Sequence, residues 1–161
     1  MAVSHPPISD LESHLGYWLR RVSNDVSASF ARRLDGEGVT VAEWVVLRML
    51  QDVGEVAPGR LAEAMRMTRG AISKLAERLV AKGLVDRLED PADGRGQILA
   101  LTAAGRAMVP GLAALADAND AAFFGCLEPA ERSELERLLR KIATGMTWTA
   151  CRRTSPVQPT V

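Results

Sequence analysis

The stretch 58–102 constrains the fold of this chain more than any other part of its sequence. Pro58 suits the first turn of a helix, and Thr68 can cap a second helix that begins directly after it. Two short segments, 84–88 and 97–101, then favour strands, and the residues between them are rich in turn signals. We therefore predict helix, turn, helix and a β-hairpin with a projecting loop, which is the order of a winged helix-turn-helix.

The second predicted helix of this unit is strongly basic. Residues 66–82 contain five Lys or Arg and one Glu, so five minus one leaves a net charge of +4. The whole chain is neutral, with 20 basic and 20 acidic residues, so this charge is local. In a helix-turn-helix the first residues of this helix meet base edges in the major groove. We therefore predict double-stranded DNA as a partner, with a merely solvated basic face as the alternative. The predicted contacts from this helix are Thr68, Arg69, Gly70, Ser73, Lys74 and Arg78.

Segment 93–102 carries the most specific motif in the chain. It runs Asp-Gly-Arg-Gly-Gln-Ile-Leu-Ala-Leu-Thr. This resembles the wing signature of the MarR family, Asp-x-Arg-x-x-x-Leu-x-Leu-Thr. The run 79–87 resembles the end of that family's recognition helix and its first wing strand, and 102–105 resembles its Thr-x-x-Gly helix start. The similarity spans roughly residues 10–148.

The resemblance implies roles for two residues of the wing. In the family the Asp of the signature holds the Arg, and the Arg enters the minor groove, so Asp93 and Arg95 are predicted DNA contacts. A nearby carboxylate can orient a guanidinium by a charge-assisted hydrogen bond, and a narrow groove attracts the positive charge. A surface ion pair without a role in DNA binding is the alternative. Gly94 and Gly96 flank Arg95 where family wings often carry further basic residues, so a weaker contribution is expected.

Amphipathic helices are predicted on both sides of the DNA-binding region 40–102. A Ser-x-x-Glu capping box beginning at Ser9 and an apolar stripe with steps of three and four predict one helix over 10–35. Thr40 and Glu43 repeat the capping-box signal for the next helix, and Thr102 can cap the first of the further helices predicted over 103–148. The tail 149–161 is expected to be disordered. The fold class is therefore mainly α with a small β-hairpin wing, a winged helix-turn-helix with long N- and C-terminal helices.

The resemblance implies that these end helices pair with those of a second copy. A homodimer would place two recognition helices about one DNA turn, ~34 Å, apart on a pseudo-palindromic operator. The sequence itself indicates only amphipathic helices, so a monomeric bundle is the alternative. Repression is the common mode of the family and is expected on that ground alone. The candidates for the shared apolar core are Leu11, Leu15, Phe123, Leu135, Leu138, Leu139 and Ile142.

The resemblance also implies a small-molecule effector. Many members of the family release DNA when a small ligand, often aromatic and anionic, binds between the dimer helices and the winged unit. On the first two predicted helices, His14, Trp18, Trp44 and Arg48 are the candidates to line such a pocket. The alternative is that they are core or solvated residues with no ligand.

Other classes of function find little support in the sequence. No Gly-rich phosphate loop, catalytic triad or metal-ligand spacing is present, so we predict neither an enzyme nor a cofactor. No apolar run of about 18 residues and no secretion signal is seen, so a cytoplasmic protein without membrane contact is expected. Redox control is a weak alternative, because the family's peroxide sensors use a cysteine in the first helix and this chain has only Cys126 and Cys151. A winged helix that binds a protein instead of DNA also stays open.

Overall fold

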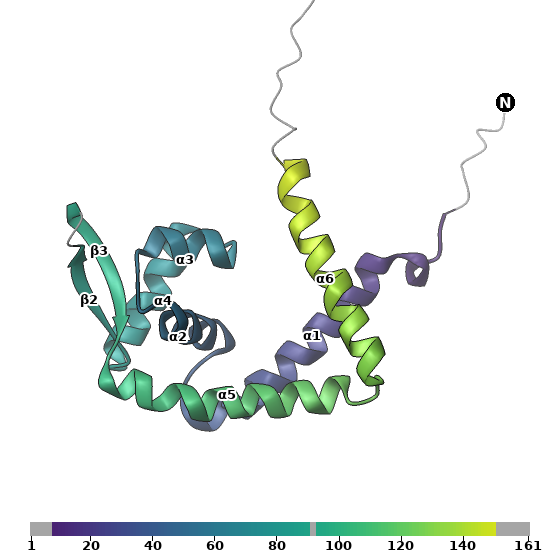
Figure 1. The fold of residues 1–161 in the computed structure, drawn as a ribbon, viewed down its shortest axis with the longest axis horizontal. Coiled ribbons are helices and arrows are strands. Elements are labelled where there is room, and N and C mark those ends of the chain that lie inside the picture. The colour runs from purple at the N-terminus through teal and green to yellow at the C-terminus, as the bar shows by residue number, and fades with distance from the viewer. Residues whose placement is uncertain (1–7, 91–92, 151–161) are drawn as a thin grey trace, which may run out of the picture. The chain divides into compact units, whose positions relative to one another are not determined.

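The computed structural model describes the backbone of residues 8–90 and 93–150, and the side chains of these residues except 93–95 and 146–150. Within them, most residues lie in α-helices, and a small antiparallel sheet contains a hairpin that projects from the helices (Figure 1). The elements are a 3-10 turn (Leu11–Ser13), α1 (Leu15–Leu34), a second 3-10 turn (Asp35–Glu37), α2 (Val41–Val53), β1 (Glu55–Val56), α3 (Pro58–Met65), α4 (Arg69–Ala81), β2 (Val85–Asp90), β3 (Asp93–Leu101), α5 (Ala103–Phe124) and α6 (Pro129–Ala150). The predicted fold class, mainly α with a winged helix-turn-helix, is confirmed.

The sheet has the order β1-β3-β2, with both pairs antiparallel. The short strand β1, in which Val56 pairs with Leu99, was not predicted, because two residues carry no periodic signal. The wing also differs from the expected loop over 89–96. Its strands continue until Asp90 pairs with Asp93, so the hairpin projects as paired strands rather than as a long loop (Figure 1).

Side-chain caps define several of the helix starts as predicted. Thr40 and Glu43 form a reciprocal capping box at the start of α2. The Thr68 hydroxyl accepts from the Ala71 N–H at 3.2 Å, and the Thr102 hydroxyl accepts from the Gly105 N–H at 3.0 Å. Each cap satisfies a backbone donor that the first helical turn leaves unpaired.

The predicted capping box at Ser9 is wrong. The chain instead makes a 3-10 turn at Leu11–Ser13, and α1 begins at Leu15 without a side-chain cap. The reason is that the first turns of α1 bury nothing in this chain, and its buried residues, Phe30 and Leu34, lie at its other end. Packing of an apolar face is what stabilises most helices, so propensity alone does not determine where this one starts.

The apolar core lies inside the winged unit. Side chains from α1, α2, α3, α4 and α5 meet there, and Leu34, Leu47, Leu61, Leu79 and Leu112 are fully buried. The end of α1 and the first half of α5 therefore pack with the helix-turn-helix rather than apart from it. Among the described residues, those up to Asp120 form one compact unit, and those from Ala121 to Ala150 form another.

Gly105 explains why the Thr-x-x-Gly segment ends in glycine. A Cβ atom at this position would lie 2.1 Å from the Leu84 carbonyl oxygen, far inside contact distance. The Thr102 hydroxyl donates to the Gly83 carbonyl at 2.7 Å and holds the two segments together. This close approach joins the start of α5 to the end of the recognition helix.

In the second unit, α6 is a two-sided helix. Ion pairs Glu134–Arg137 and Glu136–Arg140 lie on its surface, while Leu138, Leu139 and Ile142 are each about 40 to 50% exposed. The helix continues to Ala150, two residues past the predicted limit of 148. The rest of the predicted tail, including Cys151, lies outside the described residues.

Candidate nucleic-acid interface

The start of α4 presents a polar face over a buried one. Ile72, Leu75 and Leu79 are buried, in steps of three and four. The six predicted contacts are all exposed: Thr68, Arg69, Gly70, Ser73, Lys74 and Arg78. The structure therefore brings the predicted residues of this helix together on one face. Space is open above it, because a Cβ atom on Gly70 would meet no atom within 4 Å.

A tight turn before α4 sets the direction of this helix. Arg66 has φ +51°, a left-handed conformation that is uncommon for a residue with a side chain. Its N–H donates to the Glu63 carbonyl, and the Met67 N–H donates to the Ala62 carbonyl at 2.9 Å. Arg66 thus ends α3. The sequence prediction placed it in the basic helix, but α4 begins only at Arg69.

The cations at the far end of α4 are engaged by Glu43 of α2. The Lys82 ammonium lies 2.7 Å from Glu43 Oε2 and also donates to the Gly38 carbonyl at 2.7 Å. The Arg78 Nε lies 3.2 Å from Glu43 Oε1. Glu43 is fully buried, so one carboxylate neutralises part of the charge of two residues.

The ionisation of Glu43 follows from these contacts. Burial by itself raises the pKa of its carboxyl group, because it disfavours the charged form. The hydrogen bond from Lys82, the N–H of Thr40 and the charge of Lys82 act in the opposite direction and prevail. The pKa therefore lies below its ordinary value, and Glu43 is an anion at neutral pH.

Sequence reasoning found Glu43 as a capping residue and missed its ion pairs. The capping box was visible because Thr40 and Glu43 are close in sequence, whereas Lys82 is 39 residues away. The cations of α4 and its C-cap Lys82 therefore fall into two groups. Within the described residues, no hydrogen bond or ion pair engages the side chains of Arg69 and Lys74, while Arg78 and Lys82 have a partner.

The wing residues Asp93 and Arg95 lie in β3, and their side chains lie outside the described residues. The other wing strand contacts α4 through an ion pair, in which Arg87 Nη2 is 3.9 Å from Glu77 Oε1. The hairpin thus remains attached to the recognition helix at its base.

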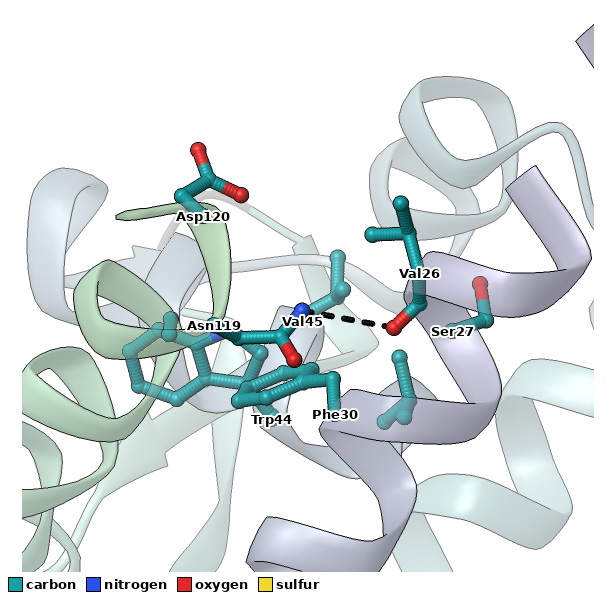
Figure 2. A pocket seen from close by; sticks show the side chains of 9 residues that line it. Val26, Ser27, Phe30, Trp44, Val45, Asn119 and Asp120 are labelled. Carbon is teal, nitrogen blue, oxygen red and sulfur yellow. Dashed lines mark hydrogen bonds between the residues drawn. The ribbon is translucent and has the colours of Figure 1, made fainter. Parts of the chain in front are cut away.

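The four predicted pocket residues do not come together. Trp44 is buried and lines a cavity of about 260 Å³, with Phe30 edge-on at 6.3 Å between ring centroids (Figure 2). His14 and Trp18 are exposed, and the Trp18 indole N–H donates to the Glu12 carbonyl. Arg48 is exposed and pairs with Asp52 one turn further along α2.

Of the nine residues that line this cavity, only Trp44 was predicted, and Phe30 and Asn119 are among the eight that sequence reasoning missed. Phe30 belongs to the apolar stripe of α1, and Asn119 lies in α5 with its side chain 2% exposed. An asparagine in a helical segment gives no sequence signal of burial, because its type is usually exposed.

Within the part of the chain that the structure describes, neither a membrane-spanning helix nor a metal site is found. Its helices are too short or too polar to span a bilayer. No three His, Cys, Asp or Glu side chains gather there as a metal site would require.

The fold and the exposed polar face of α4 define a winged-helix DNA-binding protein. The sequence profile of the MarR family matches residues 37–96. The HTH-type transcriptional repressor Rv2887 of Mycobacterium tuberculosis is 30% identical over 133 residues, which cover 83% of this chain and 96% of that repressor. The chain therefore belongs to the MarR family, whose members are transcriptional regulators and not enzymes.

Solved structures of family members agree with this fold. BpsR of Bordetella bronchiseptica, whose DNA binding is regulated by 6-hydroxynicotinic acid, has a TM-score of 0.79 and 31% identity, covering 85% of this chain and 98% of BpsR. A mutant of MarR from Escherichia coli in complex with operator DNA has a TM-score of 0.77 and 29% identity, covering 83% and 99%. Rv2887 in complex with salicylic acid has a TM-score of 0.65 and 31% identity, covering 80% and 96%.

Proposed function

We propose that this protein is a homodimeric repressor that binds a pseudo-palindromic operator and is released by a small aromatic ligand. The observation that carries the DNA-binding part is the start of α4, where exposed cations and hydroxyls lie over a fully buried face. MarR of Escherichia coli, which has this fold, has been captured with operator DNA.

Each polar residue of this face suits a particular contact. Arg69 and Lys74 can donate to guanine O6 and N7 or to phosphates. The hydroxyls of Thr68 and Ser73 can likewise donate to base edges or to phosphates. Gly70 leaves room for the backbone to approach the DNA. The wing contributes Arg95 to the minor groove, with Asp93 to orient it.

The dimer is supported by apolar side chains that the described chain leaves uncovered. On the first half of α1 and the turn before it, five are 41 to 78% exposed: Leu11, Leu15, Trp18, Leu19 and Val22. On α6, Leu138, Leu139 and Ile142 are similarly exposed. Exposed apolar side chains gathered on a helix in this way mark an interaction site, and a second copy of the chain is the partner we propose.

The effector is supported by the cavity beside Trp44 and Phe30, because it is concave, mostly apolar and lined by two aromatic rings. Two similar proteins are known with aromatic acids, as described above. The cavity lies against α2, whose Glu43 holds the far end of α4, so a ligand there can alter the position of the recognition helix.

Fluorescence anisotropy on DNA from upstream of the protein's own gene tests DNA binding. Saturable binding to one palindromic fragment should weaken steeply with salt, because phosphate contacts release counterions. Arg95→Ala should weaken binding and leave the dimer intact by light scattering, and Lys141→Ala on α6 is the matched control without effect. Binding no tighter than to random DNA would contradict the proposal and favour a winged helix that serves a protein partner. A monomer at micromolar concentration would contradict the dimer alone.

A further inference from the structure

The buried carboxylate of Glu43 uses its two oxygens differently. Oε2 accepts from the Thr40 N–H at 2.8 Å and from the Lys82 ammonium at 2.7 Å. Oε1 lies 3.2 Å from the Arg78 Nε, and it is buried without a hydrogen bond among the described residues. The hydrogen bonds to Oε2 therefore fix the carboxylate, while Oε1 attracts Arg78 by charge.

Arg78 belongs to the exposed face of α4 that carries the predicted DNA contacts. Gly70, Lys74 and Arg78 follow one another in steps of four, so they share one side of the helix. The Arg78 side chain is 57% exposed, and within the described part of the chain none of its five N–H donors makes a hydrogen bond. The guanidinium can therefore lie beside Glu43 and still offer donors to a DNA phosphate.

A fixed anion changes how a flexible cation binds DNA. An arginine side chain loses rotamer freedom when it contacts a phosphate, and a partner that already restricts the side chain reduces this loss. Glu43 suits this task because it is fully buried and its own position is fixed by Thr40 and Lys82. Phosphate contacts determine the register of a protein on the duplex, so the position of Arg78 influences which bases the start of α4 meets.

The same carboxylate also repels DNA. Its negative charge lowers the affinity for every sequence alike, because all duplexes carry the same phosphates. Positioning of Arg78 favours the operator, because only there do base contacts hold the helix in one register. Removal of the charge should therefore act differently on the operator and on random DNA, and this difference separates the two roles.

We propose that Glu43 is a positioning residue for operator recognition: it holds Arg78 where the guanidinium contacts a DNA phosphate, and so raises the preference for the operator without touching DNA itself. The inference rests on the proposed DNA binding by α4. It gives the Glu43–Arg78 ion pair a role in specificity as well as in stability.

Glu43→Gln tests this role and keeps the size of the side chain. Anisotropy titrations at one salt concentration compare the palindromic fragment from upstream of the protein's own gene with random DNA. The operator affinity should fall about 10-fold, and the affinity for random DNA should stay the same or rise. Glu77→Gln neutralises an exposed carboxylate of the same helix, so it is the matched control and should keep the wild-type preference. A urea melt of each variant checks that it is folded.

A double-mutant cycle identifies Arg78 as the residue through which Glu43 acts. Arg78→Ala should weaken operator binding about 10-fold and reduce the salt dependence by about one counterion. In the Arg78→Ala background, Glu43→Gln should cause no further loss, whereas a merely structural role of Glu43 would lower the affinity equally in both backgrounds. If Glu43→Gln does not fold, Glu43→Asp takes its place, because it keeps the charge and withdraws the carboxylate from Arg78.

The outcomes separate this inference from the proposed function. A wild type that binds random DNA as tightly as the palindromic fragment would contradict operator recognition itself. If the wild type discriminates and the Glu43 variant discriminates equally well, only this inference is overturned. Additive losses in the cycle would overturn it too, as would an Arg78→Ala loss of less than about 2-fold, which is measured on an exposed residue and does not depend on any Glu43 variant folding.

Discussion

The two ends of the recognition helix carry the same residue types and make different contacts. At its start, the cations Arg69 and Lys74 are exposed and engage no other side chain among the described residues. At its end, Arg78 and Lys82 lie 3.2 and 2.7 Å from the buried carboxylate of Glu43. One half of the charge is thus available to an external partner, and the other half attaches the helix to α2.

This difference teaches that a count of charges along a helix does not measure its attraction for DNA. The Arg78 side chain is still 57% exposed, so it can contact a phosphate while paired. Lys82 is also bound to the Gly38 carbonyl, and its ammonium has few donors left. We therefore assign DNA contact mainly to the start of α4 and positioning of the helix to its end.

The largest expected effect comes from removing the anchor at the far end. Glu43→Ala deletes a fully buried carboxylate, two ion pairs and one half of a capping box, and should lower the free energy of unfolding by about 2–4 kcal/mol. The estimate stays moderate because Arg78 and Lys82 can return to water. Urea denaturation at fixed protein concentration measures it. A loss below about 1 kcal/mol would mean that Glu43 does not hold the helix.

The next effect compares one lysine from each end. Lys74→Ala should weaken operator binding by about 1–3 kcal/mol if it contacts a base, or reduce the salt dependence by about one counterion if it contacts a phosphate. Lys82→Ala should change the intrinsic affinity for DNA much less and should mainly lower stability. Anisotropy titrations at several salt concentrations, run beside urea melts, measure both quantities. Equal losses of affinity for the two variants would break the comparison.

A smaller effect should appear on acidification. Because the folded-state pKa of Glu43 is lowered, its contribution to stability is complete above the ordinary pKa of about 4.3 and is lost as the pH falls through the lowered value. The difference in unfolding free energy between the wild type and Glu43→Gln should therefore shrink as the pH drops below about 4. Parallel urea melts from pH 7 to pH 3 measure it, and a pH-independent difference would show that the Glu43 charge is not involved.

The smallest effect is expected at the exposed ion pair between α4 and β2. Glu77 and Arg87 are 3.9 Å apart near the surface, so Glu77→Gln should change stability by no more than about 0.5 kcal/mol. It serves as the control for Glu43→Gln, since each variant neutralises one carboxylate that pairs with a cation. A Glu77→Gln loss as large as that of Glu43→Gln would show that burial is not what distinguishes the two carboxylates.

Much of the fold was predictable because its signals are local. The caps at Thr40, Thr68 and Thr102 depend on residues three positions away, and each formed as expected. The capping box at Ser9 carries the same signal and did not form, and among the described side chains the first turns of α1 contain no buried residue. Local signals therefore predicted helix ends only where the core supported them.

Part of the candidate site was also predictable, because the signals for it are local. The polar face of α4 follows from helical periodicity, and its residues lie together as expected. The four predicted pocket residues do not lie together. A cavity joins segments that are far apart in the sequence, as the hydrogen bond between Val26 and Asn119 does across 93 residues. The wing contacts Asp93 and Arg95 and the DNA contacts themselves remain proposals.

The sequence by itself determined the order of the helices and the hairpin, the basic start of the recognition helix and the motif that marks the family. These depend on neighbouring residues, whose spacing along the chain sets which face each side chain occupies. Only the tertiary structure decided which cations Glu43 neutralises and that the buried Asn119 donates to the Val26 carbonyl. Both follow from burial, since removal from water makes a carboxylate bind its cations strongly and makes a buried amide favour a nearby hydrogen-bond partner.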